Sequence, residues 1–67
     1  MKNEVLIQLR GDRSQGEMAK EIGIPKSTYA MVENGHRFPR RELQMKLSRH
    51  FKRTVDELFF AQFDRVS

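Results

Sequence analysis

Apolar residues recur along this 67-residue chain at intervals of three and four, the spacing that places side chains on one face of a helix. Five segments follow this pattern, and none shows the alternation of apolar and polar residues that is typical of a strand. The sequence therefore predicts an all-α fold of five helices. The apolar positions that set the pattern are Val5, Leu6 and Leu9; Met18, Ala19 and Ile22; Tyr29 and Val32; Leu43, Leu47 and Phe51; and Val55, Leu58 and Phe59.

Capping residues mark the ends of the second and third helices. Ser14, with Glu17 three residues later, has the pattern of a capping box, and Gly23 suits the left-handed backbone that ends a helix. Pro25 fits the entry to the next helix, which ends near Gly35. The segment 14–35 is thus predicted to hold two short helices joined by a tight turn.

Similar signals delimit the other helices. The first helix is expected to end near Gly11, and Pro39 to open the fourth. Thr54 is expected to cap the fifth, with Glu57 completing a second capping box. Connections of about two to five residues would make neighbouring helices turn sharply and pack as one compact globule.

Several features of the segment 14–35 favour a helix-turn-helix over an arbitrary helical hairpin. Ala19 is small where the two helices cross, and Gly23 permits the sharp turn. Tyr29 and Val32 bury the inner face of the second helix. Its outer face has one charge and no large aromatic side chain, so it can enter a groove of DNA. The residues of that outer face are Lys26, Ser27, Ala30, Met31 and Asn34.

The net charge of +4 is unevenly distributed along the chain. Positive and negative charges balance over residues 1–22, positive charges exceed negative ones by six over residues 23–53, and negative charges exceed positive ones by two over residues 54–67. The basic block begins at the second helix of the motif, where contacts to phosphates would be needed. A solvated basic surface is the alternative interpretation.

Composition excludes several other classes of protein. Cysteine is absent and no apolar run approaches the roughly 18 residues that cross a bilayer, so disulfides, cysteine-based zinc sites and membrane spans are excluded. The N-terminal segment is too short and too charged for a secretory signal, so we expect one cytoplasmic domain over residues 1–67. His36 and His50 lack the neighbours of a metal site or a catalytic site. We expect no enzyme, cofactor, metal, membrane partner or small-molecule substrate.

A larger set of residues points to a known family: Gln15, Met18, Ala19, Gly23, Ile24, Ser27, Thr28, Tyr29, the run 32–35, Arg37, Pro39 and the run 55–59. Through these residues the chain resembles the Cro and phage-repressor type of helix-turn-helix domain, the XRE family. The resemblance covers nearly all of the chain and implies a compact five-helix, repressor-like domain that binds double-stranded DNA. The segment between Arg10 and Gln15 is shorter than is usual in the family, so the first helix is expected to end abruptly, and Pro25 stands where a capping serine or threonine is more common.

The resemblance implies that the helix after Pro25 lies in the major groove while the helix before it crosses the DNA backbone. The implied base contacts are Lys26, Ser27, Thr28, Ala30 and Met31, and the expected phosphate contacts are Gln15, Asn34, Arg37, Arg40 and Arg41. The alternatives are that Lys26 is a solvated lysine, that Met31 covers the edge of the core, and that solvent tolerates the repulsion between the arginines. Arg10 is expected to pair inside the domain with Glu33, because the family pairs an arginine at this place with the glutamate of the Glu-Asn-Gly run.

The phenylalanines near the C-terminus suggest self-association. Phe59 and Phe60 are adjacent, so they point to different sides of a helix, and at least one is expected to be exposed unless something covers it. A second copy would cover it and would place two recognition helices about 34 Å apart on a pseudo-palindromic operator. We therefore expect a homodimer interface within residues 54–67, although the tail could instead fold back over its own domain. The interface residues would be Phe59, Phe60, Phe63 and Val66.

The sequence thus predicts a transcriptional regulator, a repressor that occupies an operator in double-stranded DNA as a homodimer. The length leaves no room for a ligand-sensing or self-cleaving domain, so regulation is expected from protein concentration, assembly or a partner protein. The alternative is an antitoxin-like or adaptor module that uses the same fold to bind another protein, with DNA contact secondary.

Overall fold

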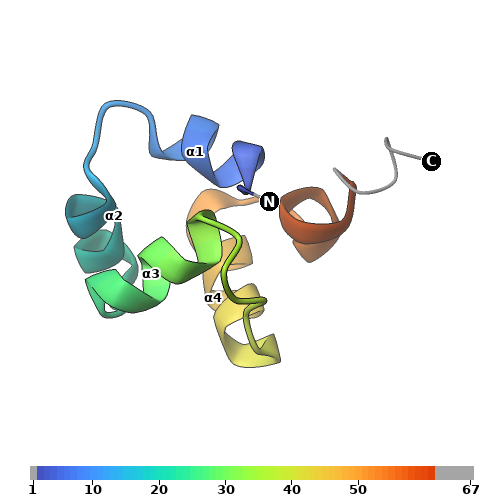
Figure 1. The fold of residues 1–67 in the computed structure, drawn as a ribbon. Helices are drawn as coiled ribbons and strands as arrows, with labels where there is room; N and C mark the ends of the chain where they lie inside the picture. The colour runs from blue at the N-terminus through green and yellow to red at the C-terminus, as the bar shows by residue number, and fades with distance from the viewer. Residues whose placement is uncertain (1, 62–67) are drawn as a thin grey trace.

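The computed structural model describes residues 2–61, and within that range its regular elements are all helices, with no strand (Figure 1). The predicted all-α fold of five helices is confirmed. Helices α2 and α3 cross on one side of the molecule, α4 packs against α2, and the last helix lies at the opposite end, near the N-terminus (Figure 1). The elements are α1 (Glu4–Arg10), α2 (Gln15–Ile22), α3 (Lys26–Glu33), α4 (Arg41–Phe51) and the π-helix η1 (Asp56–Phe60).

A single cluster of buried apolar side chains joins these helices. Ala19 is 1 % exposed where α2 packs against α3, and Tyr29 is completely buried on the inner face of α3. Each large side chain that is fully buried stabilises the fold by about 1.5–3 kcal/mol, so the recognition motif depends on the core beneath it. The cluster consists of Leu6, Met18, Ala19, Ile22, Tyr29, Val32, Leu47, Leu58 and Phe59.

Both predicted capping boxes are present. The backbone N–H of Glu17 donates to Ser14 Oγ at 3.0 Å, and the backbone N–H of Ser14 donates to Glu17 Oε1 at 2.9 Å. The hydrogen bond from the Ser14 backbone is the main cause that lowers the pKa of Glu17. Thr54 and Glu57 make the same reciprocal pair at 3.0 Å. Gly23 ends α2 with φ 89° and ψ 36°, the left-handed conformation that the turn was expected to need.

The start of α4 differs from the sequence prediction. Pro39 does not open the helix, because the chain stays extended through Arg40, whose ψ is 163°, and α4 begins at Arg41. The carbonyl of Pro39 accepts a hydrogen bond of 2.8 Å from the side chain of Gln44, which holds this extended segment against the first turn. The connection between α3 and α4 therefore runs over residues 34–40 and is longer than expected.

The last helix is also different in type. A capping box normally begins an α-helix, but in η1 the N–H of Ala61 bonds to the carbonyl of Asp56, five residues earlier, as in a π-helix. Leu58 and Phe59 of η1 are buried in the core.

Asn3 forms hydrogen bonds with three helices. Its Oδ1 accepts from the N–H of Leu6 at 3.0 Å and caps α1, while its Nδ2 donates to the carbonyl of Leu58 in η1 at 2.9 Å. Its backbone N–H donates to the carbonyl of Glu33, the last residue of α3, at 2.8 Å. The buried Asn3 therefore fixes the end of α3 relative to η1.

Arg13 stabilises the short connection between α1 and α2. Its guanidinium donates to the carbonyls of Leu9 and Arg10 at 3.0 and 3.1 Å and forms a 2.7 Å salt bridge with Glu21 of α2. In return, Arg10 Nη1 donates to the carbonyl of Arg13 at 2.8 Å. Helix α1 accordingly ends abruptly, at Gly11, where φ is 63°.

Candidate nucleic-acid interface

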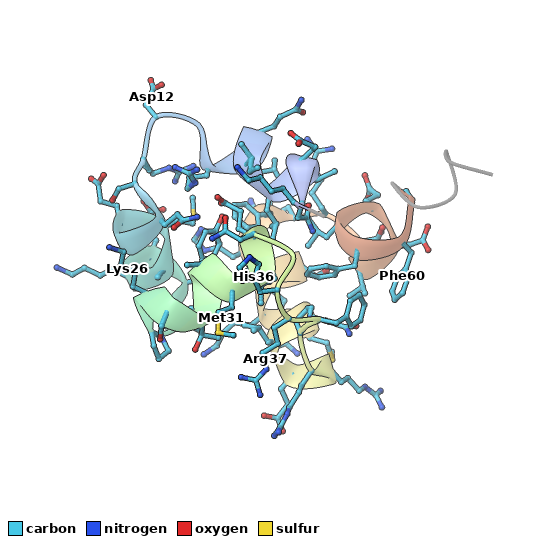
Figure 2. The ribbon with its side chains drawn as sticks, in the orientation of Figure 1. Asp12, Lys26, Met31, His36, Arg37 and Phe60 are labelled. Atoms are coloured by element: carbon cyan, nitrogen blue, oxygen red, sulfur yellow. The ribbon has the colours of Figure 1, made fainter. Side chains whose placement is uncertain are left out.

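The outer face of α3 carries the residues expected to contact bases. Tyr29, Val32 and Glu33 face the core, which leaves the opposite side of this helix to solvent. Figure 2 shows Lys26 at the start of α3, Met31 further along it and Arg37 in the connection that follows. Lys26, Ser27 and Met31 are exposed, with Met31 at 40 %, and Thr28 and Ala30 are half-buried.

The side chain of Lys26 runs beside the first turn of α2. A Cβ atom at Gly16 would lie 3.5 Å from Cδ of Lys26, which is ordinary van der Waals contact. The starts of α2 and α3 are therefore adjacent, so a nucleic acid that meets Lys26 also meets the N-terminus of α2.

Behind this face, Glu33 is the centre of a buried polar network. Its carboxylate is 1 % exposed and accepts from Arg10 Nε at 2.9 Å, Arg10 Nη2 at 3.0 Å and Gln15 Nε2 at 2.9 Å. Burial alone would raise the pKa of Glu33, but the hydrogen bonds from Arg10 and Gln15 bring it below its usual value. The same hydrogen bond to Glu33 is the main cause that raises the pKa of Arg10. Burial, reinforced by the Glu33 carboxylate, raises the pKa of Tyr29.

Arg10 and Glu33 thus form the expected ion pair, but Gln15 requires a correction. Its side-chain amide, expected at a phosphate, donates to Glu33 and approaches Asn34 Oδ1 at 3.5 Å. In this arrangement the amide orients Glu33 inside the domain, and only the backbone N–H groups of the first turn of α2 remain to meet a phosphate. The half-buried Asn34 contacts Gln15 through its side chain and ends α3.

A basic segment follows α3. Arg37, Arg40 and Arg41 are exposed, and no salt bridge involves them in the described part of the chain. The N–H groups of His36 and Arg37 both donate to the carbonyl of Met31, at 2.9 and 3.2 Å, which folds the segment back onto the end of α3. The N-cap residue of α4, Arg40, makes no side-chain hydrogen bond to the first turn, so the backbone N–H groups of that turn can bind another acceptor. They lie beside Arg40 and Arg41, and this combination favours an anion.

The aromatic residues of η1 are divided between the core and the surface. Phe59 is 2 % exposed, so its expected role at a dimer interface is wrong: it fills the core instead. Phe60 is 42 % exposed, and Phe38, which the sequence did not single out, is 54 % exposed. The Phe38 ring lies 5.9 Å from that of Phe59 and 5.6 Å from that of Phe60. Phe63 and Val66, also expected at the interface, lie outside the described residues.

The part of the chain that the structure describes contains neither a candidate metal site nor a candidate membrane span. Over residues 2–61, acidic residues, histidines and cysteines never gather in groups of three or more that could hold a metal ion. In the same range every helix is too short or too polar to cross a membrane.

The fold and the α3 surface together define a helix-turn-helix domain. A family model for helix-turn-helix proteins matches residues 6–58, which cover most of α1, all of α2 to α4 and the first part of η1. The chain belongs to this family, the Cro/C1 or XRE type of DNA-binding regulators. Comparisons with curated proteins and with solved structures gave no match.

Three residues with a clear structural role carried no signal in the helical pattern. Phe38 lies in the connection between α3 and α4, where helical periodicity gives no information. Asn3 precedes α1 and has the residue type of an N-cap, which could have identified it. Nothing in the sequence distinguishes Arg13 from a solvated arginine, because the fold brings its partners near, namely two carbonyls and the carboxylate of Glu21.

Proposed function

We propose that this domain is a transcriptional regulator that binds a specific sequence of double-stranded DNA as a homodimer and represses by occupying an operator. One observation carries the proposal: the exposed outer face of α3 continues directly into the segment of Arg37, Arg40 and Arg41, and none of these arginines forms a salt bridge among residues 2–61. A groove-reading face and a phosphate-binding segment on one continuous surface fit a DNA duplex.

In this proposal the base contacts come from α3. Lys26 donates to guanine, Ser27 and Thr28 bond to bases or phosphate, and Ala30 and Met31 contact a thymine methyl group. Replacing a side chain that reads a base costs about 1–3 kcal/mol on the preferred sequence and relaxes the preference at that position.

The phosphate contacts come from Arg37, Arg40 and Arg41 with the start of α4, from Asn34, and from backbone N–H groups at the start of α2, since the Gln15 amide is engaged with Glu33. These contacts act on any sequence. Each one lost lowers the slope of log affinity against log salt by about one.

The homodimer would form through Phe38 and Phe60. These side chains are 54 % and 42 % exposed and touch each other, so they form a small apolar surface at the end of the molecule away from α2. A second copy would cover this surface. Sedimentation tests the proposal: Phe60→Ser should shift a micromolar sample towards monomer, whereas Met45→Ser, at an exposed apolar residue of α4, should not. An unchanged dimer in Phe60→Ser would contradict this interface.

Protein binding with only secondary DNA contact, as in an antitoxin or adaptor, is the competing proposal. The two are separated by titrating the protein against the DNA upstream of its own gene and against scrambled DNA at several salt concentrations. A regulator protects an inverted repeat and loses affinity with a slope of about −0.9 per neutralised phosphate. Sequence-blind binding that salt does not change would favour the competing proposal. We also expect that the protein is not an enzyme and that it acts in the cytoplasm.

A further inference from the structure

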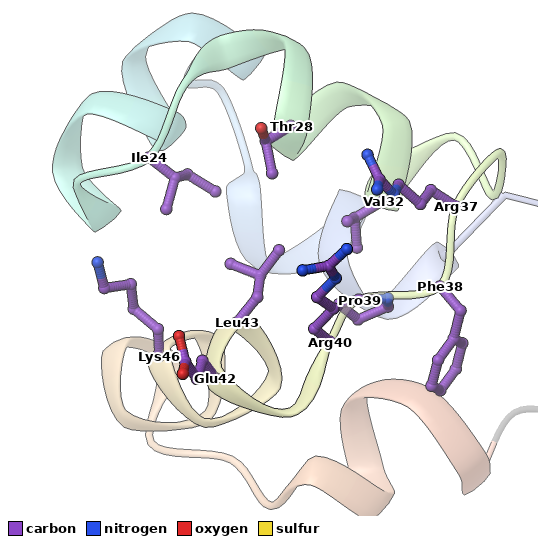
Figure 3. Close-up of a pocket in the computed structure, with 10 residues that line it drawn as sticks. All are labelled: Ile24, Thr28, Val32, Arg37, Phe38, Pro39, Arg40, Glu42, Leu43 and Lys46. Carbon is purple, nitrogen blue, oxygen red and sulfur yellow. The ribbon is translucent and has the colours of Figure 1, made fainter.

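A cleft of about 380 Å³ opens between α3 and the start of α4, and we call it the α3–α4 cleft (Figure 3). Ile24, in the turn before α3, and Val32, near the end of α3, line one wall, and Leu43 of α4 lines the other. The segment 37–40 closes one end. In Figure 3 the side chains of Ile24 and Leu43 point towards each other across the cleft.

The walls of this cleft offer apolar surface that contact with a DNA backbone does not require. Ile24 and Leu43 pack against the core, yet both remain half-buried. Phosphates and sugars are bound through charges and hydrogen bonds, which the arginines and free N–H groups supply. The exposed carbon atoms of Ile24 and Leu43 instead suit an apolar group that leaves water on binding.

The rim of the cleft is basic. Arg37, Arg40 and Lys46 are exposed on it, against Glu42 as the acidic residue of the lining. None of these three cations takes part in a salt bridge among residues 2–61. The uncapped start of α4 adds positive potential beside them. An occupant with negative charge around an apolar centre would complement both the rim and the apolar walls.

The size of the cleft indicates how large that apolar centre is. Pockets that enclose drug-sized ligands measure about 300–1,000 Å³, and this open cleft lies at the lower end of that range. It has room for one bulky side chain with its flanking backbone outside. We propose that the α3–α4 cleft binds an acidic segment of a partner protein, which inserts one bulky apolar side chain between Ile24 and Leu43 and places carboxylates against Arg37, Arg40 and Lys46.

This binding would control the DNA-binding activity, a consequence that rests on the proposed function. Thr28, Arg37 and Arg40 line the cleft and are also proposed DNA contacts. A carboxylate of the partner bound to Arg37 or Arg40 takes up donors that a phosphate would use, and its negative charge repels that phosphate, so we expect the acidic segment and the duplex to exclude each other. A partner of this kind would make the domain release the operator by binding in the cleft, without covering the base-reading side chains of α3 other than Thr28.

A labelled synthetic peptide with one phenylalanine between two pairs of aspartates is the probe. Two control peptides have serine in place of the phenylalanine or of the aspartates. NMR titration of the isotope-labelled full chain should show amide shifts at Ile24, Thr28 and Leu43, and the serine-for-phenylalanine peptide should bind about tenfold more weakly. Shifts elsewhere, or equal affinity for all three peptides, would overturn the proposal. If a small aromatic carboxylate bound as tightly as the peptide, the cleft would be a small-molecule site and the proposal of a protein partner would be wrong.

Two variants outside the proposed DNA contacts test the rim. Lys46→Glu should weaken the peptide about fivefold, and Glu42→Gln should tighten it, whereas Lys2→Glu, with the same charge change at an exposed lysine outside the lining, should leave it unchanged. Equal effects of Lys46→Glu and Lys2→Glu would mean that only net charge matters and would contradict a built site.

The link to DNA is tested separately by adding the peptide to the protein bound to a labelled duplex. The peptide should release the duplex, and the serine-for-phenylalanine peptide should need about tenfold more. Peptide binding with the expected shifts but simultaneous duplex binding would refute the mutual exclusion alone. A protein that binds the peptide but no duplex at any salt concentration would refute the proposed function, while the cleft assignment would stand.

Discussion

Removing the guanidinium from the buried ion pair by Arg10→Ala should destabilise the domain strongly. The Glu33 carboxylate is 1 % exposed and would lose the donors at 2.9 and 3.0 Å while keeping the amide of Gln15. Leaving one partner of a buried pair unpaired costs about 3–5 kcal/mol. The Arg10 side chain is 22 % exposed, so water can reach part of the vacated space, and we expect about 3 kcal/mol.

That loss is large for this chain. Domains are stable by about 0.05–0.15 kcal/mol per residue, which gives about 3–10 kcal/mol for 67 residues. The melting temperature should therefore fall by about 12–24 °C. Urea unfolding followed by circular dichroism measures the change. The fluorescence of Tyr29, the only tyrosine in a chain without tryptophan, reports on the core beside Glu33.

Arg41→Ala is the matched control, because Arg41 is exposed and has no salt bridge among the described residues. It should change stability by less than about 0.5 kcal/mol while weakening DNA binding. The penalty of Arg10→Ala should shrink in acid, where the unpaired Glu33 becomes protonated and neutral. If Arg10→Ala kept its full stability but lost DNA binding, the arginine would be a DNA contact and the assignment to Glu33 would be wrong.

Three further predictions follow from individual contacts. Asn3→Ala removes the cap of α1 and the bond to Leu58, so denaturant unfolding should show a loss of about 1–2 kcal/mol; an unchanged midpoint would contradict its role. The pKa of Glu33 is lower in the folded than in the unfolded state, so its contribution is complete above about pH 4.3 and is lost as the pH falls through the folded value; unfolding midpoints should decline in acid, and less steeply in Glu33→Gln. Gly23→Ala, at φ 89°, should cost about 1 kcal/mol in thermal unfolding, whereas Gly16→Ala, where a Cβ meets only ordinary contacts, should be neutral or stabilising.

Local chemistry explains which parts of the fold the sequence predicts. The capping box of Ser14 and the left-handed glycine after α2 act within a few residues, so their residue types suffice to place them. The inward positions of Tyr29 and Val32 follow from helical spacing alone. The pairing of Arg10 with Glu33 was accessible only through the resemblance to a known family.

The differences arise where tertiary contacts decide. Pro39 has the residue type of a helix start, but its carbonyl binds the side chain of Gln44, so α4 begins later. The Gln15 amide was expected to point outward to a phosphate, but it donates to Glu33 instead, because that buried carboxylate needs a further hydrogen-bond donor. Phe59 is buried in the core and Phe60 is exposed. The sequence predicts that the two side chains point to different sides of the helix, but it does not predict which one is buried.

The central claim is that the outer face of α3 reads bases while the basic segment after it binds phosphates. Selection of bound duplexes from a random library tests it most directly, with the wild-type chain, Ser27→Ala and Arg41→Ala compared side by side. We predict that the wild type enriches an inverted repeat, that Ser27→Ala enriches a relaxed or altered half-site, and that Arg41→Ala enriches the same repeat with lower affinity and a smaller salt slope. The absence of an enriched sequence, or a repeat that Ser27→Ala leaves unchanged and Arg41→Ala alters, would contradict the claim.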